Sequence, residues 1–170
     1  MKTRNLIALL FITMMLNASS LYAQTEFHVP ENYVLKVAAD YANYESDLVA
    51  ASKWMEATDL DKEIDKRARV NKFMFDWTYG CPFSIMMPLE LGNIYGKNNE
   101  LLIIYMAGYA RYYIENKATA TEFAEKKAGL ISIMNVYKKG IDIKRSKEME
   151  KVIKADNDNT LDVYIKEKFN

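Results

Sequence analysis

Cysteine, histidine, glycine and proline are all scarce in this chain of 170 residues. Cys81 is the only cysteine, so an internal disulfide and a two-cysteine zinc site are both excluded. His28 is the only histidine and lies in the expected N-terminal tail, which excludes a histidine-based catalytic triad and a zinc site built on two histidines. Six glycines and three prolines are too few for an all-β protein with many tight turns.

The chain also has no excess of charge of one sign, because 23 basic residues balance 23 acidic ones. Basic and aromatic residues do not alternate on one face, so we expect no binding to nucleic acid. The chain has no glycine-rich phosphate loop and no Gly-x-Ser-x-Gly sequence. Paired carboxylates such as Asp76 and Glu90 are not singled out by any spacing. We therefore expect neither a cofactor nor a bound metal ion.

The first residues have the three-part layout of a secretory signal peptide. Lys2 and Arg4 give a positive start, and residues 6–16 form an apolar run of 11 residues broken only by Thr13. Small and polar residues follow up to Ala23. A short membrane anchor is the alternative, but 11 residues fall short of the roughly 20 that a spanning helix needs.

Cleavage is expected after Ala23, with a cut after Ser20 as the alternative. Residues 1–23 are thus predicted to be a signal peptide and residues 24–170 a single helical domain. No later run is suited to cross a membrane, since the best one, 101–114, contains Arg111. The mature protein is expected in the periplasm or outside the cell, with no stable membrane span.

Every strong periodicity in the mature chain is helical, with apolar residues three and four positions apart. The fold class is therefore all-α: a compact bundle of five to seven helices around a buried central helix. The first expected helix is 33–57, with an interruption at Ser46 or Asp47, and the second is 61–78, capped by Asp59 or Asp61. The central helix is 100–116, and the next begins at a Thr119/Glu122 capping box and ends at 139 before Gly140. Two shorter helices are expected to begin at Ser146 and at Asp158, Asn159 or Thr160.

Burial follows from the same helical pattern. We expect Trp77, Ile103, Ala107 and Met134 to be buried and Arg67 and Lys126 to be exposed. Phe75 belongs to the apolar second half of helix 61–78, which is expected to enter the core. Arg111 and Glu115 are expected to form an ion pair on a solvent-exposed strip.

The sequence Cys-Pro-Phe-Ser at 81–84 resembles the one-cysteine active sites of glutaredoxin-like and glutathione-transferase-like folds. The resemblance implies that a helix N-terminus lowers the pKa of the Cys81 thiol and creates a nucleophilic thiolate. Those folds place the motif after a β-strand, whereas the residues before Cys81 form an expected helix, and Pro88 would break a long following helix. The alternative is that Cys81 is a buried apolar side chain.

Tyrosines provide two candidate binding surfaces. Tyr105 and Tyr109 lie on one stripe of the central helix and are either a platform for sugar rings or part of the core. The apolar segment 80–97 is expected to be irregular with at most one short helix. It is either a lid on the bundle or a functional loop with Tyr79 and Tyr95 as aromatic anchors.

A calcium-loop template also fits the C-terminal region in part. Asp156, Asp158, Thr160, Asp162 and Glu167 occupy its ligand positions. The sharp turn of the template needs glycine where this chain has Leu161, so a loop followed by a helix cap is the preferred interpretation.

These observations favour an exported, non-enzymatic binding or accessory module for a protein or glycan partner. The alternative is a thiol-dependent enzyme or redox protein that uses Cys81. In size and compartment the chain is similar to periplasmic immunity proteins that block secreted bacterial toxins, although no motif supports that similarity.

Overall fold

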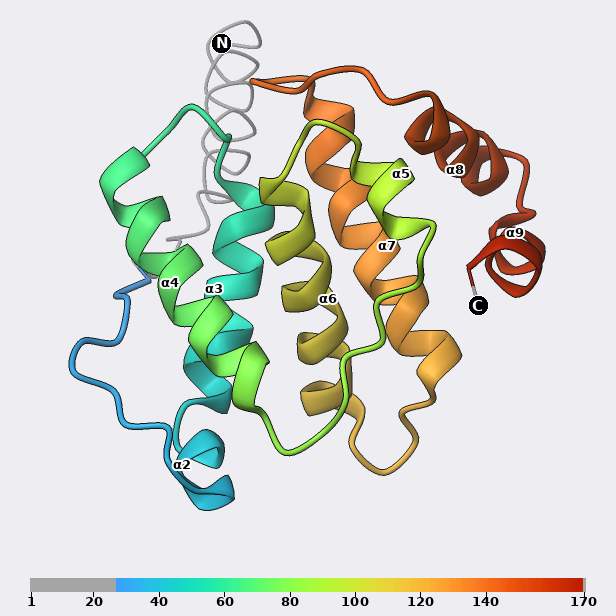
Figure 1. The fold of residues 1–170 in the computed structure, drawn as a ribbon. Helices are drawn as coiled ribbons and strands as arrows, with labels where there is room; N and C mark the ends of the chain where they lie inside the picture. The colour runs from blue at the N-terminus through green and yellow to red at the C-terminus, as the bar shows by residue number, and fades with distance from the viewer. Residues whose placement is uncertain (1–26, 170) are drawn as a thin grey trace, which may run out of the picture.

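The computed structural model describes residues 27–169, and this part of the chain is all-helical, with eight helices and no strand (Figure 1). The helices are α2 (Ala38–Ala42), α3 (Glu45–Ala57), α4 (Ile64–Gly80), α5 (Leu91–Tyr95), α6 (Glu100–Asn116), α7 (Glu122–Lys139), α8 (Lys147–Asn157) and α9 (Leu161–Lys168). The all-α prediction is confirmed. The predicted signal peptide, residues 1–23, lies outside the described residues.

The predicted number of five to seven helices was too low, because the sequence pattern did not distinguish the short helices α2 and α5 as separate elements. The expected helix 33–57 is divided at Asn43 and Tyr44 into α2 and α3, not at Ser46 or Asp47. Residues 27–37, here called the N-terminal segment, are not helical. The carboxylate of Asp40 accepts hydrogen bonds from the Lys36 and Val37 N–H groups and so fixes the entry into α2.

Helix α6 is the buried centre of the fold, as predicted. It lies between α3 and α4 on one side and α7 on the other, while α5, α8 and α9 lie on the α7 side (Figure 1). Helices α6 and α7 approach closely because small residues face each other. A Cβ atom at Gly108 would lie 2.1 Å from Ser132 Oγ, and one at Gly129 would lie 2.6 Å from a ring carbon of Tyr105.

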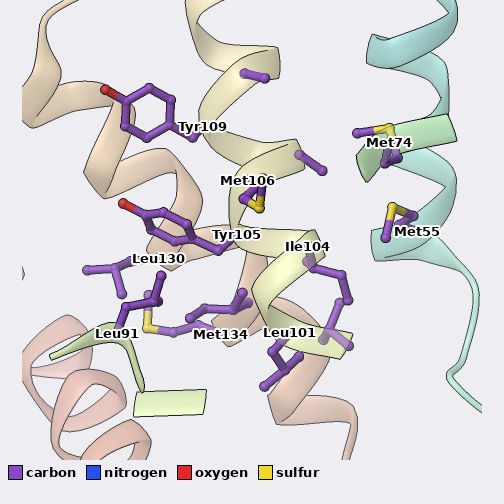
Figure 2. Packing of buried hydrophobic residues seen from close by; sticks show 14 of the residues in the cluster. Met55, Met74, Leu91, Leu101, Ile104, Tyr105, Met106, Tyr109, Leu130 and Met134 are labelled. Atoms are coloured by element: carbon purple, nitrogen blue, oxygen red, sulfur yellow. The ribbon is translucent and has the colours of Figure 1, made fainter. Parts of the chain in front are cut away.

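The predicted burial is confirmed at three residues that are each 1% exposed: Trp77, Ala107 and Met134. Figure 2 shows Met134 and Leu130 beside α6 in the cluster of buried side chains. Ile103 was predicted to be buried but is only half-buried, whereas Ile104 is 1% exposed. The reason is that α3 and α4 pack on the face of α6 to which Ile104 belongs, which is also the face of Arg111 and Glu115 that was expected to be exposed to solvent.

Arg67 was predicted to be exposed but is 3% exposed. Its guanidinium donates hydrogen bonds to the Thr58 and Asp59 carbonyl oxygens, at 2.8 and 3.0 Å, and lies 3.2 Å from Glu100 Oε1. It also lies over the Trp54 ring, 5.1 Å from its centroid. Arg67 thus joins α4 to the α3–α4 turn and to the start of α6.

Lys126 was also predicted to be exposed and is 7% exposed. Helix α7 is covered by α6 on one side and contacts α3, α8 and α9 on others, so little of its surface remains open. The Lys126 ammonium is paired with Glu122 one turn earlier, at 2.6 Å.

Arg111 does not pair with Glu115, as the sequence suggested, but with Glu56 on α3 at 2.7 Å. Ser132 on α7 donates a hydrogen bond to the same Glu56 oxygen at 2.7 Å. The expected pair would have been local to α6, whereas the observed cluster joins α3, α6 and α7. Glu115 instead pairs with Lys53.

Helix termini were predicted with mixed success. Helix α4 begins after Glu63, whose φ is 48°, and not after Asp59 or Asp61. The N-cap of α7 is Thr121, which accepts a hydrogen bond from the Ala124 N–H, so the Thr119/Glu122 capping box is wrong. Gly140 ends α7 in the left-handed conformation, as predicted. Ser146 caps α8, and Thr160 is the residue before α9.

Candidate functional site

Cys81 stands at the C-terminal end of α4, and residues 82–88 after it form no helix. The thiol is partly buried, with the carbonyl oxygens of Thr78 and Phe83 3.4 and 3.1 Å from Sγ. Burial raises the pKa of the Cys81 thiol. The C-terminal end of a helix carries partial negative charge, which also disfavours a thiolate. The geometry is therefore opposite to that of a thiol activated at a helix N-terminus.

Tyr105 and Tyr109 are 0% and 1% exposed, so their rings belong to the core and offer no face to a sugar. Figure 2 shows both rings on the same side of α6, pointing away from Met55 and Met74. Burial is the main cause that raises the pKa of each phenol. The Tyr105 hydroxyl donates a hydrogen bond to the Met86 carbonyl oxygen at 2.9 Å.

The segment 80–97 holds one short helix, α5, and crosses the bundle in front of α6 and α7 (Figure 1). The two proposed anchors lie at its opposite ends and are not brought together. Tyr79, in the last turn of α4, is 82% exposed. Tyr95, in α5, is half-buried and packs against the core. Only Tyr79 therefore has the exposure that an aromatic anchor requires.

The three aspartates of the calcium-loop template are paired with lysines. Asp156 pairs with Lys138, Asp158 with Lys154, and Asp162 with Lys127. The three aspartates thus point to three separate lysines instead of to one shared ion. Over residues 27–169, no group of three His, Cys, Asp or Glu side chains is placed to hold a metal ion. No helix in the same range combines the length and apolarity that crossing a membrane requires.

A groove lies between the N-terminal segment, α2 and the outer side of α4, and its exposed aromatic rim makes it the candidate functional site. Its volume is about 310 Å³, within the range of small-molecule pockets. We call it the aromatic groove, and it is lined by Tyr33, Leu35, Tyr41, Phe75, Asp76, Tyr79 and Gly80. Asp76 is its only charged residue.

Two stacked rings form the rim of the aromatic groove. The Phe75 and Tyr79 centroids are 5.8 Å apart and the ring planes differ by 18°. The two residues are one helical turn apart on α4, so their side chains share a face. Phe75 was predicted to enter the core but is 49% exposed, because Phe73, Met74 and Trp77 occupy the inner face.

Asp76 is held in its ionised form at the junction of the groove and the N-terminal segment. Its Oδ2 atom accepts hydrogen bonds from Lys72 Nζ and from the Tyr33 hydroxyl, both at 2.5 Å. These bonds, the Lys72 one first, hold the pKa of the Asp76 carboxyl below its usual value. Within the described residues Oδ1 has no hydrogen-bond partner, so one carboxylate oxygen remains available to a ligand.

Gly80 leaves room in the groove for the Tyr41 hydroxyl. A Cβ atom at Gly80 would lie 2.0 Å from that oxygen, so any larger residue would displace the Tyr41 ring. The hydroxyl is 3.4 Å from the Leu35 carbonyl oxygen, which is a weak hydrogen bond. The groove thus offers a phenol, a carboxylate oxygen and exposed ring faces within one small space.

Sequence reasoning found Tyr79 but missed the other aromatic and apolar side chains of the groove, which are Tyr33, Leu35, Tyr41 and Phe75. A signal was present for Phe75, since positions 75 and 79 are both aromatic at i,i+4 and stand off the Phe73–Trp77 face. No comparable signal existed for Tyr33 and Leu35, because non-helical residues have no periodicity that predicts the helix they contact.

Comparison of the chain with protein-family models, curated proteins and solved structures gives no match.

Proposed function

We propose that this chain is an exported, non-enzymatic binding protein that holds its partner in the aromatic groove. The observation that carries the proposal is the exposed Phe75–Tyr79 stack at the rim. Adjacent exposed apolar side chains mark binding sites more often than single exposed residues do, and aromatic side chains are enriched among binding anchors. Tyr79 is 82% exposed and Phe75 is 49% exposed.

The groove is also pre-formed. Tyr33 packs edge to face against Phe73, with centroids 5.2 Å apart, and its hydroxyl is held by Asp76. Tyr41 packs in the same way against the buried Trp77. A ligand would therefore meet side chains that are already ordered, which lowers the entropic cost of binding.

The thiol-enzyme alternative is less well supported. The fold raises the pKa of Cys81 and surrounds the thiol with carbonyl oxygens, so the nucleophilic thiolate is disfavoured. Cys81 is also not among the residues that line the groove.

Export supplies the context of the proposal and rests on the layout of residues 1–23. Mass spectrometry of the protein recovered from the periplasm of a Gram-negative host should find Gln24 or Leu21 at the N-terminus. An intact Met1 in the membrane fraction would contradict the cleavage.

Binding is tested with the periplasmic protein immobilised and exposed to envelope extract of the native cells. The variants are Tyr79→Ser, which removes the rim ring, and Leu89→Ser as the matched control. Leu89 is 91% exposed and apolar but lies outside the groove. Tyr79→Ser should retain at least about fivefold less of the captured component, which corresponds to an anchor worth about 1 kcal/mol.

The Leu89→Ser variant should capture as much as the wild-type protein. Equal capture by the wild-type protein and Tyr79→Ser would contradict the proposal, provided that both have the same helix content by circular dichroism. Loss of capture in Leu89→Ser instead would move the site to segment 80–97.

A further inference from the structure

We infer that the aromatic groove binds a neutral pyranose ring with equatorial hydroxyl groups, as found in β-1,4-linked glucose or N-acetylglucosamine oligomers. The inference rests on the proposed function and names the class of ligand for the same site. It depends on the combination of side chains that the groove presents, taken in three steps.

The first step concerns the stacked rim. Phe75 and Tyr79 are stacked, which holds the Tyr79 ring in place, and Tyr79 is 82% exposed, so its ring offers a face to a ligand. The face of an aromatic ring carries partial negative charge and attracts weakly positive C–H groups. A pyranose whose hydroxyls are all equatorial presents C–H groups on both broad faces. Such a sugar can therefore stack on the ring with either face, whereas an axial hydroxyl would interrupt the contact on the face that carries it.

The second step concerns the polar atoms beside the rim. Asp76 lies between Phe75 and Tyr79 in the sequence, and its free Oδ1 atom can accept a hydrogen bond from a sugar hydroxyl. The Tyr41 hydroxyl makes only a weak bond to Leu35 and can exchange it for a bond to the ligand. Sugar hydroxyls both donate and accept, so a carboxylate and a phenol satisfy them together.

The third step concerns charge and size. Asp76 is the only ionic group that lines the groove, and Lys72 already pairs with it at 2.5 Å, so the groove offers no unpaired cation to an anionic sugar and suits a neutral one. A volume of about 310 Å³ lies at the lower end of the range for ligand pockets, which suits one ring of a longer chain lying across the rim. A protein segment would need a larger apolar surface than this groove offers.

The test uses cellotetraose and chitotetraose as probes and the periplasmic protein at neutral pH. Saturation-transfer difference NMR should show transfer to ring C–H protons, and isothermal calorimetry should give saturable binding of at least one probe. Tyr79→Ser should weaken that binding at least tenfold, and Asp76→Asn should weaken it as well. Tyr79→Phe keeps the ring and should stay within about threefold of the wild-type protein, and Leu89→Ser should be unchanged.

Tetragalacturonic acid, which carries a carboxylate on each ring, should not bind. The inference is overturned if neither neutral probe binds at millimolar concentration, or if Tyr79→Ser binds as well as the wild-type protein. If Tyr79-dependent capture from envelope extract persists and the captured component is degraded by protease, the sugar inference fails while the proposed function stands. If the Tyr79-dependent capture is also absent, both fail.

Discussion

The rings of Tyr41 and Trp77 meet edge to face, with their centroids 5.7 Å apart, and the Trp77 indole N–H donates a hydrogen bond to the Tyr41 carbonyl oxygen at 3.2 Å. Tyr41 lines the aromatic groove, whereas Trp77 belongs to the buried core. The groove is therefore attached directly to the buried core.

Substitutions at two residues of α4 should distinguish the buried core from the exposed rim of the groove by their effect on stability. Trp77→Ala should lower the free energy of unfolding by about 3–5 kcal/mol, because it empties a large buried site. Tyr79→Ser, two residues later on the same helix, should change it by less than about 0.5 kcal/mol, because Tyr79 is exposed. Urea unfolding followed by circular dichroism measures both. A large loss of stability in Tyr79→Ser would mean that the ring has a structural role.

The close contact of α6 and α7 should not tolerate an added methyl group. Gly108→Ala would place a Cβ atom 2.1 Å from Ser132 Oγ, and this overpacking should cost about 1–3 kcal/mol. Gly92→Ala is the matched control, since its Cβ would have no atom closer than 4.0 Å. The control should be neutral or slightly stabilising by thermal unfolding, as alanine favours a helix over glycine. Equal melting temperatures for the two variants would show that the helices are farther apart than described.

Arg67 on α4 can be tested with Arg69 of the same helix as its control. Arg67→Ala should lower stability by about 1–3 kcal/mol, because it leaves the Thr58 and Asp59 carbonyl oxygens without their donor. Arg69 is exposed and makes no hydrogen bond or ion pair within the described residues, so Arg69→Ala should change stability by less than about 0.5 kcal/mol. Chemical denaturation distinguishes the two, and a reversed order would contradict the buried position of Arg67.

The Cys81 thiol should be slow to react in the folded protein. Because its pKa is raised in the fold, the protonated form is favoured, so its contribution to stability is complete below the unfolded pKa of about 8.5 and is lost as pH rises through the folded pKa. Alkylation by iodoacetamide should therefore reach half of its alkaline rate at a higher pH in the native protein than in urea. Faster alkylation of the native protein at pH 7 would instead support an activated thiol.

Much of the fold could be predicted from the sequence because helical periodicity and helix caps are local signals. The central helix 100–116 matches α6, and Gly140 and Ser146 mark the termini that were expected. The errors lie where a long-range contact decides the outcome. Arg67 was predicted to be exposed because its neighbours in sequence are charged. Its guanidinium instead donates hydrogen bonds to carbonyl oxygens of the preceding turn and pairs with Glu100 of another helix.

The candidate site could be predicted only in part for the same reason. Tyr79 was identified because it begins an irregular apolar segment, and this required no knowledge of tertiary contacts. Its partner Tyr95 was chosen by the same reasoning, yet it lies at the other end of the segment. Two further residues of the groove, Tyr33 and Leu35, come from the N-terminal segment, which the Tyr33–Asp76 hydrogen bond joins to α4 across 43 positions of sequence.

Photo-cross-linking in living cells tests the central claim, that the aromatic groove holds the partner, most directly. A benzophenone amino acid is placed at position 79 and, as a control, at position 163, where Val163 is an exposed apolar residue on α9. Benzophenone inserts into C–H bonds of both proteins and sugars, so irradiation should produce a heavier adduct at position 79 and none at position 163. Adducts of equal yield at both positions, or none at position 79, would contradict the account.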